Sequence, residues 1–484
     1  MRRYLPLFLL CTLCAAPRAW GSAFAINELG VRAQGMAGAF ASIADDGSAI
    51  FYNPAGMAFQ TNTTMEMDTL VVVGLFRFFP SDSPPGVVTP PNGWSGSIKP
   101  HFIPVANLYF IKPINEKFTF GFGGFAPFGL STDFTNFRDG DPQNTKFPGR
   151  FAGSRAALQQ FWFQPTLSYR ISTNSSIAGG VALVHTHLFL EESILNPNTD
   201  GDTFGLAFAS TIFPGTNPAE AAASIARLLP EGRFRAAATS NKAGFNLGYM
   251  YKIPSKKISI GLAWRSAVVN HLSGKAAFAF TNTGAITPFL PAGTTFSSLF
   301  PNQPIKGDFT TPGTYTAGIS SRYFHNTLIA VDFEVQDFRR FKDLPVTFSD
   351  TVGTALPGVE TLNFDFHNSY ITHVGAERQV GENMSVRMGY SFDYSPVPDQ
   401  SVGPLFPDSS RNSVTFGGTY RHGAAEFNIF YQAMFFLERN IDVAANAGQY
   451  TNGSYRSFAD LAGLGLRLYP GQLFGKGKTS RLTQ

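Results

Sequence analysis

Alternation of apolar residues with small or polar ones is the feature of this sequence that most restricts its fold. From about residue 62 onward the chain repeats an alternating segment, a short polar turn, a second alternating segment and a long loop rich in Gly, Pro, Asn and Asp. In Phe118–Gly123 the aromatic residues fall on one face of an extended strand and the small residues on the other. In Val386–Asp393 one face is apolar, and the other carries charges that need a polar surrounding. These patterns predict strands with one face suited to lipid.

Composition leaves one class of protein that such strands can build. The 484 residues include 14% charged residues, against about 25% in an ordinary soluble domain, which is too few to coat a soluble surface of this size. The 48 glycines and 14% aromatic residues argue against a helical bundle, and a mean hydropathy of -0.02 argues against a polytopic helical membrane protein. Beyond the N-terminal segment no apolar run reaches the ~18 residues that a spanning helix needs. A transmembrane β-barrel fits all of these constraints.

The connections between the alternating segments predict the number of strands. Short turns are expected at residues 112–116, 171–175, 253–256, 324–326, 380–382 and 422–423. Long loops are expected at about residues 80–96, 129–149, 193–237, 281–307, 343–360, 395–410 and 439–453. This alternation of short periplasmic turns with long extracellular loops joins fourteen strands, an even number as in bacterial outer-membrane barrels. A soluble β-sandwich or propeller would not sort its connections by length so regularly. We therefore predict an all-β, 14-stranded antiparallel transmembrane β-barrel over residues 61–469.

Residues 1–23 predict a secretory signal peptide. Arg2 and Arg3 precede an apolar core, and small residues follow at 21–23. We expect cleavage near residues 21 to 23, so that the mature chain begins close to Phe24. Both cysteines lie in the removed segment, which excludes disulfides and thiolate chemistry from the mature chain. Removal of the segment's three arginines leaves 34 basic and 33 acidic residues, a balance that gives no reason to expect a nucleic-acid partner.

Residues 24–60 do not alternate and are rich in small side chains. Gly35, Ala37 and Gly38 belong to a run that allows close packing in a confined space. A barrel of ~14 strands leaves an interior that its own side chains do not fill. We therefore predict that residues 24–60 enter the lumen as an N-terminal hatch, and that residues 470–484 form a polar C-terminal tail. The alternative for residues 24–60 is a periplasmic extension with no role in gating.

Motifs in this N-terminal stretch and along the barrel resemble those of a known family. The stretch carries Asn27-Glu28, Gly35-Met36-Ala37-Gly38, Ala44-Asp45-Asp46 and Asn53-Pro54-Ala55. The barrel carries Phe125-Ala126-Pro127-Phe128-Gly129-Leu130, Trp264-Arg265-Ser266, Gly389-Tyr390, Asp393-Tyr394-Ser395-Pro396-Val397-Pro398, and Asp408 with Arg411. Over essentially the whole mature chain these residues resemble the FadL-type outer-membrane channels for long-chain fatty acids and hydrocarbons. The C-terminus departs from that pattern, because a polar tail follows Tyr469 where such barrels usually end on an aromatic residue.

The resemblance implies passive, gated uptake of hydrophobic molecules in the bacterial outer membrane. The expected steps are extracellular capture, binding in the lumen, movement of the hatch and lateral release through the wall. A long-chain fatty acid is the first expected substrate, and an aromatic or aliphatic hydrocarbon is the second. The resemblance assigns ligand binding to Phe24, His187 and Lys342, gating to Asn53, Pro54 and Ala55, and the lateral opening to Pro127, Phe128 and Gly129.

Two of the implied sites can also be weighed from the residues themselves. Pro127 cannot donate a hydrogen bond to a neighbouring strand, and Gly129 weakens the strand further. Both residues favour a bend in the third strand. The alternative is that Pro127 ends the strand at the rim. His187 aligns with an arginine of the family pocket and Lys342 with a lysine. An unperturbed histidine is mostly uncharged near neutral pH, so such a pocket would hold about one fixed positive charge and favour a carboxylate less. Alternatively, His187 faces lumenal water and contacts nothing.

Other functions find weaker support in the sequence. His185 and His187 have a spacing that two metal ligands could use, but no third ligand is signalled nearby, so we expect neither a metal nor a cofactor. No nucleophile elbow, nucleotide-binding loop or paired-cysteine motif is present, so we expect no enzyme, with a general diffusion porin and an outer-membrane lipid hydrolase as alternatives. The expected partners are the hydrophobic substrate and outer-membrane lipids, and we expect a monomer. A helix predicted at 217–229 either packs on the barrel rim or forms a wall of a capture groove.

Overall fold

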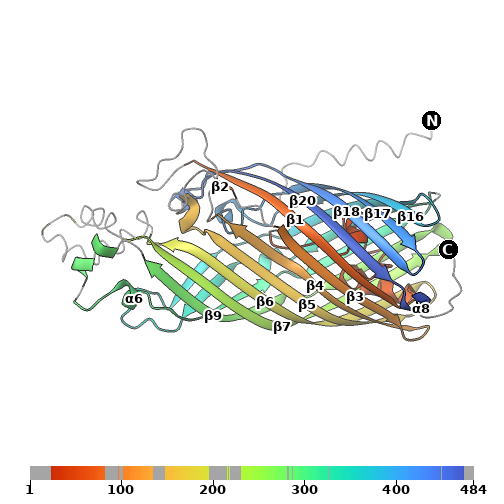
Figure 1. Ribbon diagram of the computed structural model, residues 1–484, viewed down its shortest axis with the longest axis horizontal. Coiled ribbons are helices and arrows are strands. Elements are labelled where there is room, and N and C mark those ends of the chain that lie inside the picture. Colours follow the sequence, from red (N-terminus) through yellow and green to blue (C-terminus); the bar gives the residue numbers. More distant parts are fainter. Residues whose placement is uncertain are drawn as a thin grey trace.

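The strands close into one antiparallel barrel. A computed structural model describes residues 23–81, 96–97, 102–134, 148–195, 215, 217, 230–280, 283–285, 287–290, 292–324, 326–447 and 450–473. Strand β1 (Thr64–Pro80) pairs along its length with the last strand, β20 (Gly453–Leu468), and this pairing closes the barrel (Figure 1). Every pairing between strands in the described part of the chain is antiparallel, as the alternating pattern predicts.

Fourteen strands form the wall of the barrel, as the connections predict. Nine further strands are continuous: β3 (Phe102–Pro113), β4 (Phe118–Asp133), β5 (Arg155–Arg170), β6 (Ser175–Ile194), β7 (Gly232–Ile253), β15 (Ser369–Gln379), β16 (Met384–Asp393), β17 (Arg411–His422) and β18 (Ala425–Phe436). Three strands cross in two pieces: β8 (Ile258–Arg265) with β9 (Val268–Phe280), β10 (Gln303–Thr311) with β11 (Thr314–Ser321), and β12 (Thr327–Gln336) with β13 (Asp343–Phe348). Short strands β2 (Gly96–Ser97), β14 (Val359–Asn363) and β19 (Arg439–Ile441) extend the wall beside β1, β13 and β20.

All six predicted short turns are confirmed, and they lie at the end of the barrel that carries α8 (Pro470–Leu473) (Figure 1). The long connections lie at the other end, with η3 (Pro148–Phe151), η5 (Thr283–Ala285), η6 (Thr287–Phe289), α6 (Phe296–Leu299), η8 (Asp399–Ser401) and α7 (Ala444–Ala447). Five of the seven predicted loops were too long, because strands extend into them: β4 runs to Asp133, β7 starts at Gly232, β10 starts at Gln303, β13 lies inside 343–360 and β14 starts there, and β19 lies inside 439–453. The helix predicted at 217–229 lies outside the described residues, apart from residue 217. Within the described ranges no helix is long and apolar enough to cross a membrane.

The two faces of each strand differ as the alternation predicts. On β4, Phe118 and Phe122 are exposed on the outer face, whereas Thr119 and Phe125 are buried on the inner face. The charged inner positions of β16 also behave as expected, but ion pairs rather than water stabilise them. Arg387 Nε lies 2.6 Å from Glu377 of β15, and Asp393 accepts Arg411 of β17 at 2.8 Å.

Residues 23–60, hereafter the lumenal segment, lie inside the barrel. They form α2 (Val31–Gln34), α3 (Ala49–Tyr52) and η2 (Pro54–Phe59), and nearly all of them are buried. Met36, Phe40 and Met57 are fully buried in one cluster with inner-wall side chains such as Trp162 and Met250. The segment therefore fills the part of the lumen nearest the short turns, where the wall alone would leave a channel.

Glycines of the inner wall let the backbone of the lumenal segment approach closely. A Cβ atom at any of five wall glycines would lie 2.0–2.5 Å from an atom of that segment. The nearest atom belongs to the backbone at Gly261, Gly375 and Gly389, and to a side chain at Gly121 and Gly248. Real Cβ atoms essentially never come that close to another heavy atom. The small inward residues of the alternating strands are thus required by the seating of the lumenal segment.

This fit predicts the effect of adding one side chain to the wall. In Gly389→Val, a Cβ atom would lie 2.5 Å from the carbonyl carbon of Met36 and 2.6 Å from the nitrogen of Ala37, which are backbone atoms with little freedom to move. We expect a folded barrel whose lumenal segment is displaced, so that a nearly closed pore conducts ions steadily in planar bilayers.

The matched control is Gly124→Val, where a Cβ atom would meet only the ring of Phe163 at 3.7 Å. We expect the control to behave like the unmodified protein. A Gly389→Val protein whose single-channel conductance equals that of the control would show that the lumenal segment does not close the pore.

Candidate functional site

The first residues of the lumenal segment form hydrogen bonds with the part of β4 that no longer pairs with β3. Strand β4 carries a bulge, because its register with β5 shifts between Phe125 and Phe128. At this bulge Ile26 N donates to Pro127 O at 2.8 Å, Gly129 N donates to Phe24 O at 2.9 Å, and Ala25 forms a bridge with Phe128. Pro127, Phe128 and Gly129 therefore lie together at a break in the strand, on the edge that the lumenal segment occupies.

The same break opens the ladder between β3 and β4. Their pairing runs from Pro113 opposite Thr119 only as far as Leu108 opposite Gly124. Beyond that point β3 continues to pair with β1, up to Phe102 opposite Val73. The wall therefore has a gap in its hydrogen bonds at this height, and the residues Phe24–Ile26 stand behind it.

Phe24 closes an apolar cavity next to this gap. Its side chain is 1% exposed, and its ring meets those of Phe338 and Phe341 edge-on at centroid distances of 5.1 and 5.2 Å. The cavity is lined by Phe24, Leu130, Ala156, Ala157, Leu158, Leu188, Leu190, Phe309, Phe341, Leu344, Phe364 and Phe406. Its free space of about 30 Å³ has room for only about two water molecules. A larger ligand therefore needs lining side chains such as Phe24 to move.

Of the three residues predicted to bind ligand, only Phe24 lines this cavity. His187 is half-buried on the outer face of β6, between the exposed Gln159 and Thr239, while its neighbour Leu188 faces the cavity. Lys342 is exposed, and its backbone oxygen accepts hydrogen bonds from the nitrogens at 364 and 365. The two basic residues expected to meet a carboxylate are thus not brought together here, and none of the lining residues is ionisable.

A set of hydrogen-bonded polar side chains lies on the inner wall next to the cavity. Gln160 Nε2 donates to Thr186 Oγ1 at 2.9 Å, and Thr186 donates to Asn270 Oδ1 at 2.8 Å. Trp162 Nε1 donates to Gln160 Oε1 at 2.9 Å. Gln160 on β5 and Thr186 on β6 are the inward positions two residues away from the cavity residues Leu158 and Leu188. Sequence reasoning missed this group, although its signal was polar residues at inward positions of apolar strands.

The predicted gating residues anchor the other end of the lumenal segment. Asn53 Nδ2 donates to Ala41 O at 2.7 Å and to Tyr249 O of β7 at 3.0 Å, while its Oδ1 accepts Ala55 N. Pro54 begins η2, and Ala55 O accepts Ser176 Oγ of β6 at 2.8 Å. Asn53, Pro54 and Ala55 therefore fix η2 to the wall near the short turns.

Buried ion pairs hold the middle of the lumenal segment. Arg32 of α2 makes a bidentate pair with Glu377 of β15, at 3.0 and 3.1 Å, and also binds Asp45. Arg387 shares the same Glu377 carboxylate. Because the Arg32–Glu377 pair is buried and joins the segment to the wall, loss of one partner would leave an uncompensated charge, which costs about 3–5 kcal/mol.

A second cluster surrounds Arg467 of β20. Its guanidinium lies 2.8 Å from Glu66, 3.2 Å from Asp46 and 3.3 Å from Glu426. Arg467 thus faces three carboxylates, of which Asp46 also lies 3.8 Å from Arg32. Burial, and then repulsion by Glu66, raises the pKa of Asp46 to about 7. Asp46 belongs to the lumenal segment, so the seating of that segment is linked to the binding of a proton.

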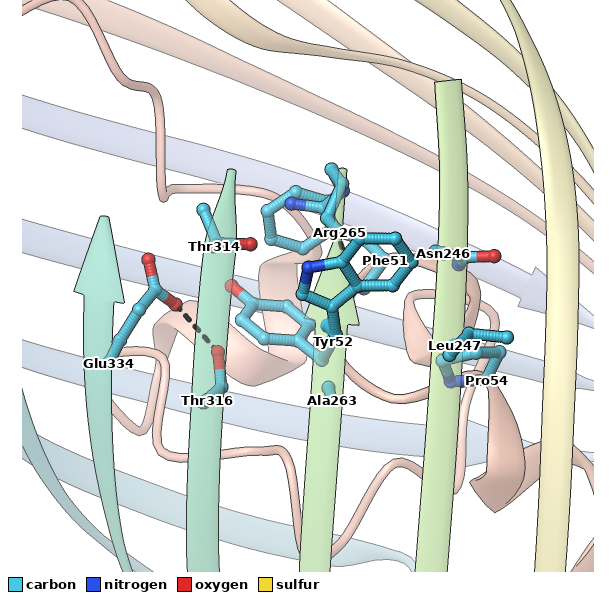
Figure 2. Close-up of a pocket in the computed structure, with 11 residues that line it drawn as sticks. Phe51, Tyr52, Pro54, Asn246, Leu247, Ala263, Arg265, Thr314, Thr316 and Glu334 are labelled. Atoms are coloured by element: carbon cyan, nitrogen blue, oxygen red, sulfur yellow. Dashed lines mark hydrogen bonds between the residues drawn. The ribbon is translucent and has the colours of Figure 1, made fainter. Parts of the chain in front are cut away.

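Figure 2 shows a polar pocket where α3 meets the wall. Arg265 of β8 donates from Nη2 to Phe51 O at 2.6 Å, and its guanidinium stacks 3.9 Å from the ring centroid of Phe51. Glu334 of β12 accepts Thr316 Oγ1 at 3.1 Å at one edge of the pocket, two strands away from β8. The free space of about 10 Å³ holds about one water molecule, so this pocket serves as an anchor for α3.

The two histidines of β6, His185 and His187, lie on the outer face of the barrel. His185 Nδ1 lies 2.8 Å from Asn241 Oδ1 on the outer face. Among the residues that the structure describes, no group of three or more His, Cys, Asp or Glu side chains is placed to hold a metal ion.

Known proteins share this architecture. The solved structure of a Pseudomonas aeruginosa FadL homologue matches with a TM-score of 0.75 at 18% identity, over 93% of this chain and 100% of that one. The Pseudomonas putida toluene transporter TodX matches with a TM-score of 0.64 at 18% identity, over 94% and 99%. Both likenesses concern the fold.

Sequence relatives extend over most of the chain. The long-chain fatty acid transport protein of Escherichia coli strain K12 is 25% identical over 420 residues, covering 83% of this chain and 85% of the relative. The outer membrane protein P1 of Haemophilus influenzae is 24% identical over 428 residues, covering 84% of each. The model of the family described as outer membrane protein transport protein (OMPP1/FadL/TodX) matches residues 12–458. The chain therefore belongs to the OMPP1/FadL/TodX family of outer-membrane transport proteins.

Proposed function

We propose that this protein is a passive, gated channel that takes up small hydrophobic molecules and releases them sideways into the outer membrane. The observation that carries the proposal is the position of Phe24, which closes an apolar cavity and stands behind the gap between β3 and β4. One displacement of Phe24–Ile26 would make room for a ligand and uncover the gap. A general diffusion porin would need an open aqueous lumen, which the lumenal segment occupies. We propose no catalytic role.

The cavity favours an uncharged substrate. An apolar molecule gains ~0.8 kcal/mol per methylene on leaving water, and the aromatic and aliphatic lining supplies that burial. A carboxylate would enter a site without a cationic partner, which is costly. We therefore propose an aromatic or aliphatic hydrocarbon as the preferred ligand. The second candidate is a long-chain fatty acid, which is favoured by the names of relatives such as the Escherichia coli protein.

The substrate class is tested by competition binding. We expect a neutral hydrocarbon to displace a bound fluorescent hydrocarbon with an affinity that does not change between about pH 5.5 and pH 7.5, and a long-chain fatty acid to bind more weakly at the higher pH as its carboxylate ionises. Phe24→Ala enlarges the cavity and should change the affinity for both ligands.

His187→Ala serves as the control, because His187 lies on the outer face. We expect it to leave the affinity for both ligands, and the pH dependence, unchanged. Two results together would instead identify a fatty-acid channel with a histidine contact. The fatty acid would bind more tightly than a hydrocarbon of equal length, and His187→Ala would abolish the pH dependence of that binding.

Lateral release is tested at the bulge of β4. Replacement of Pro127 by Val and Gly129 by Thr restores a donor to the strand and adds β-forming side chains, so β4 should straighten. We expect uptake of hydrocarbon by cells to fall several-fold while the barrel stays folded, because the gap beside β3 would narrow.

Pro165→Val is the matched control for this variant. Pro165 also lies within a barrel strand, but its side chain is exposed on the outer face of β5 and it is not part of the bulge of β4. Unaltered uptake by a well-folded Pro127→Val, Gly129→Thr protein would rule out release through this gap.

The seating of the lumenal segment should depend on pH through Asp46. Its pKa of about 7 in the seated state exceeds the ordinary 3.8, so the seated state binds a proton that a released segment gives up. Seating therefore weakens as pH rises from about 4 to about 7 and changes little above that. We expect more frequent single-channel openings at about pH 7.5 than at about pH 5. Asp46→Asn should remove this difference, and a difference that persists in Asp46→Asn would assign it to another group.

A further inference from the structure

The end of the barrel that carries the short turns has an excess of exposed positive charge. Six exposed cations lie in or beside the short turns: Lys112, Lys117, Lys256, Lys257, Arg322 and Arg378. We call these six residues the cationic rim. The exposed acids beside them are Glu116, Glu382 and Asp45, the last of which interacts with Arg322, so the cations outnumber the acids two to one. In the described part of the chain no ion pair involves the cations of the rim. The mature chain as a whole is nearly neutral, so this charge is concentrated at one end.

Exposed apolar side chains stand between these cations. Tyr323 and Phe324, next to Arg322, are 76% and 60% exposed, and their rings meet edge-on at 5.9 Å. Ile114 and Val380 project from two other short turns and are 59% and 54% exposed. Such residues would be unfavourable at the tip of a turn in water, whereas a membrane interface accommodates both apolar side chains and cations.

The rim also continues the lipid-facing surface of the wall. Lys112 follows the exposed Leu108 on the outer face of β3, and Arg378 follows the exposed Val374 on the outer face of β15. Short turns of an outer-membrane barrel face the periplasm, so we infer that the rim lies at the level of the inner-leaflet headgroups. Phosphate groups of anionic lipids attract each such Lys or Arg by about 1 kcal/mol.

We propose that the cationic rim binds the headgroups of anionic phospholipids in the inner leaflet. The apolar tips Tyr323 and Phe324 insert beside the acyl chains, while the cations contact the phosphates. A soluble polyanion would contact the cations but not the apolar side chains. The test therefore distinguishes binding of a lipid from binding of a soluble polyanion. This site is separate from the cavity, so the proposal does not depend on which molecule the channel carries.

The test measures lipid binding to the purified full-length protein by native mass spectrometry. The probes are phosphatidylglycerol and the zwitterionic phosphatidylcholine, titrated into the same detergent. For Lys256→Gln, Lys257→Gln we expect the affinity for phosphatidylglycerol to fall about fivefold per charge removed, and further when Arg322→Gln is added. The affinity for phosphatidylcholine should stay unchanged.

A matched pair of lysines serves as the control. Lys275 and Lys306 are exposed on the outer face of β9 and β10, nearer the long loops, so Lys275→Gln, Lys306→Gln removes the same charge elsewhere. We expect this control to bind phosphatidylglycerol like the unmodified protein. Equal losses in the two double variants would reduce the effect to net charge and overturn the proposal.

The apolar part of the proposal is tested separately. Tyr323→Ser, Phe324→Ser keeps every charge of the rim and should still weaken binding of phosphatidylglycerol. Unchanged binding in this variant, or competition by millimolar inorganic phosphate, would mean that the rim recognises a soluble anion rather than a lipid, and the proposal would fail. Because the barrel and cavity are untouched, hydrocarbon binding should be normal in every rim variant.

Discussion

The close approach of the lumenal segment to the inner wall is the constraint on which the rest of this structure depends. Its backbone runs against wall positions such as Gly261 and Gly389, where even a Cβ atom would collide. The polar groups of that backbone must find partners inside the barrel, and the wall supplies them. Asp332, for example, accepts the nitrogens of Phe40 and Ala41 at 2.7 and 2.6 Å. The small residues of the wall, its inward charges and the path of the lumenal segment therefore depend on one another.

That fit is not uniform along the lumenal segment. From α2 onward it is held by buried ion pairs such as Arg32–Glu377 and by the hydrogen bonds of Asn53, each of which is expensive to break. The first residues rely on two backbone hydrogen bonds at the β4 bulge, on one from Ala23 N to Asp408, and on contacts of the Phe24 ring. Local opening is drawn from the part of a structure with the fewest such interactions. Movement confined to Phe24–Ile26 would leave the ion pairs intact.

Much of the fold followed from the sequence because the alternation and the connection lengths report directly on lipid contact and strand pairing. The number of strands, the short turns and the inward direction of Arg387 were all predictable in this way. The face occupied by His187 was not. Strand β6 is apolar on both faces at this height, since Val181 and Leu183 meet lipid while Val184 and Leu188 meet the interior. Period-two patterning cannot decide which face is inside when both are apolar. The glycine contacts also escaped prediction, because they depend on a segment distant in sequence.

The size of the cavity connects binding with gating. With Phe24 in place the free space admits about two water molecules, so a ligand can enter only by taking over the contacts of that ring. The aromatic neighbours of Phe24, such as Phe338 and Phe341, gain as much from a ligand of similar size and polarity as they lose when the ring leaves. A ligand shifts an equilibrium only by its differential affinity for the two states. In the proposed channel the same displacement that admits the ligand therefore removes the residues behind the gap in the wall, and no separate signal has to pass between the two sites.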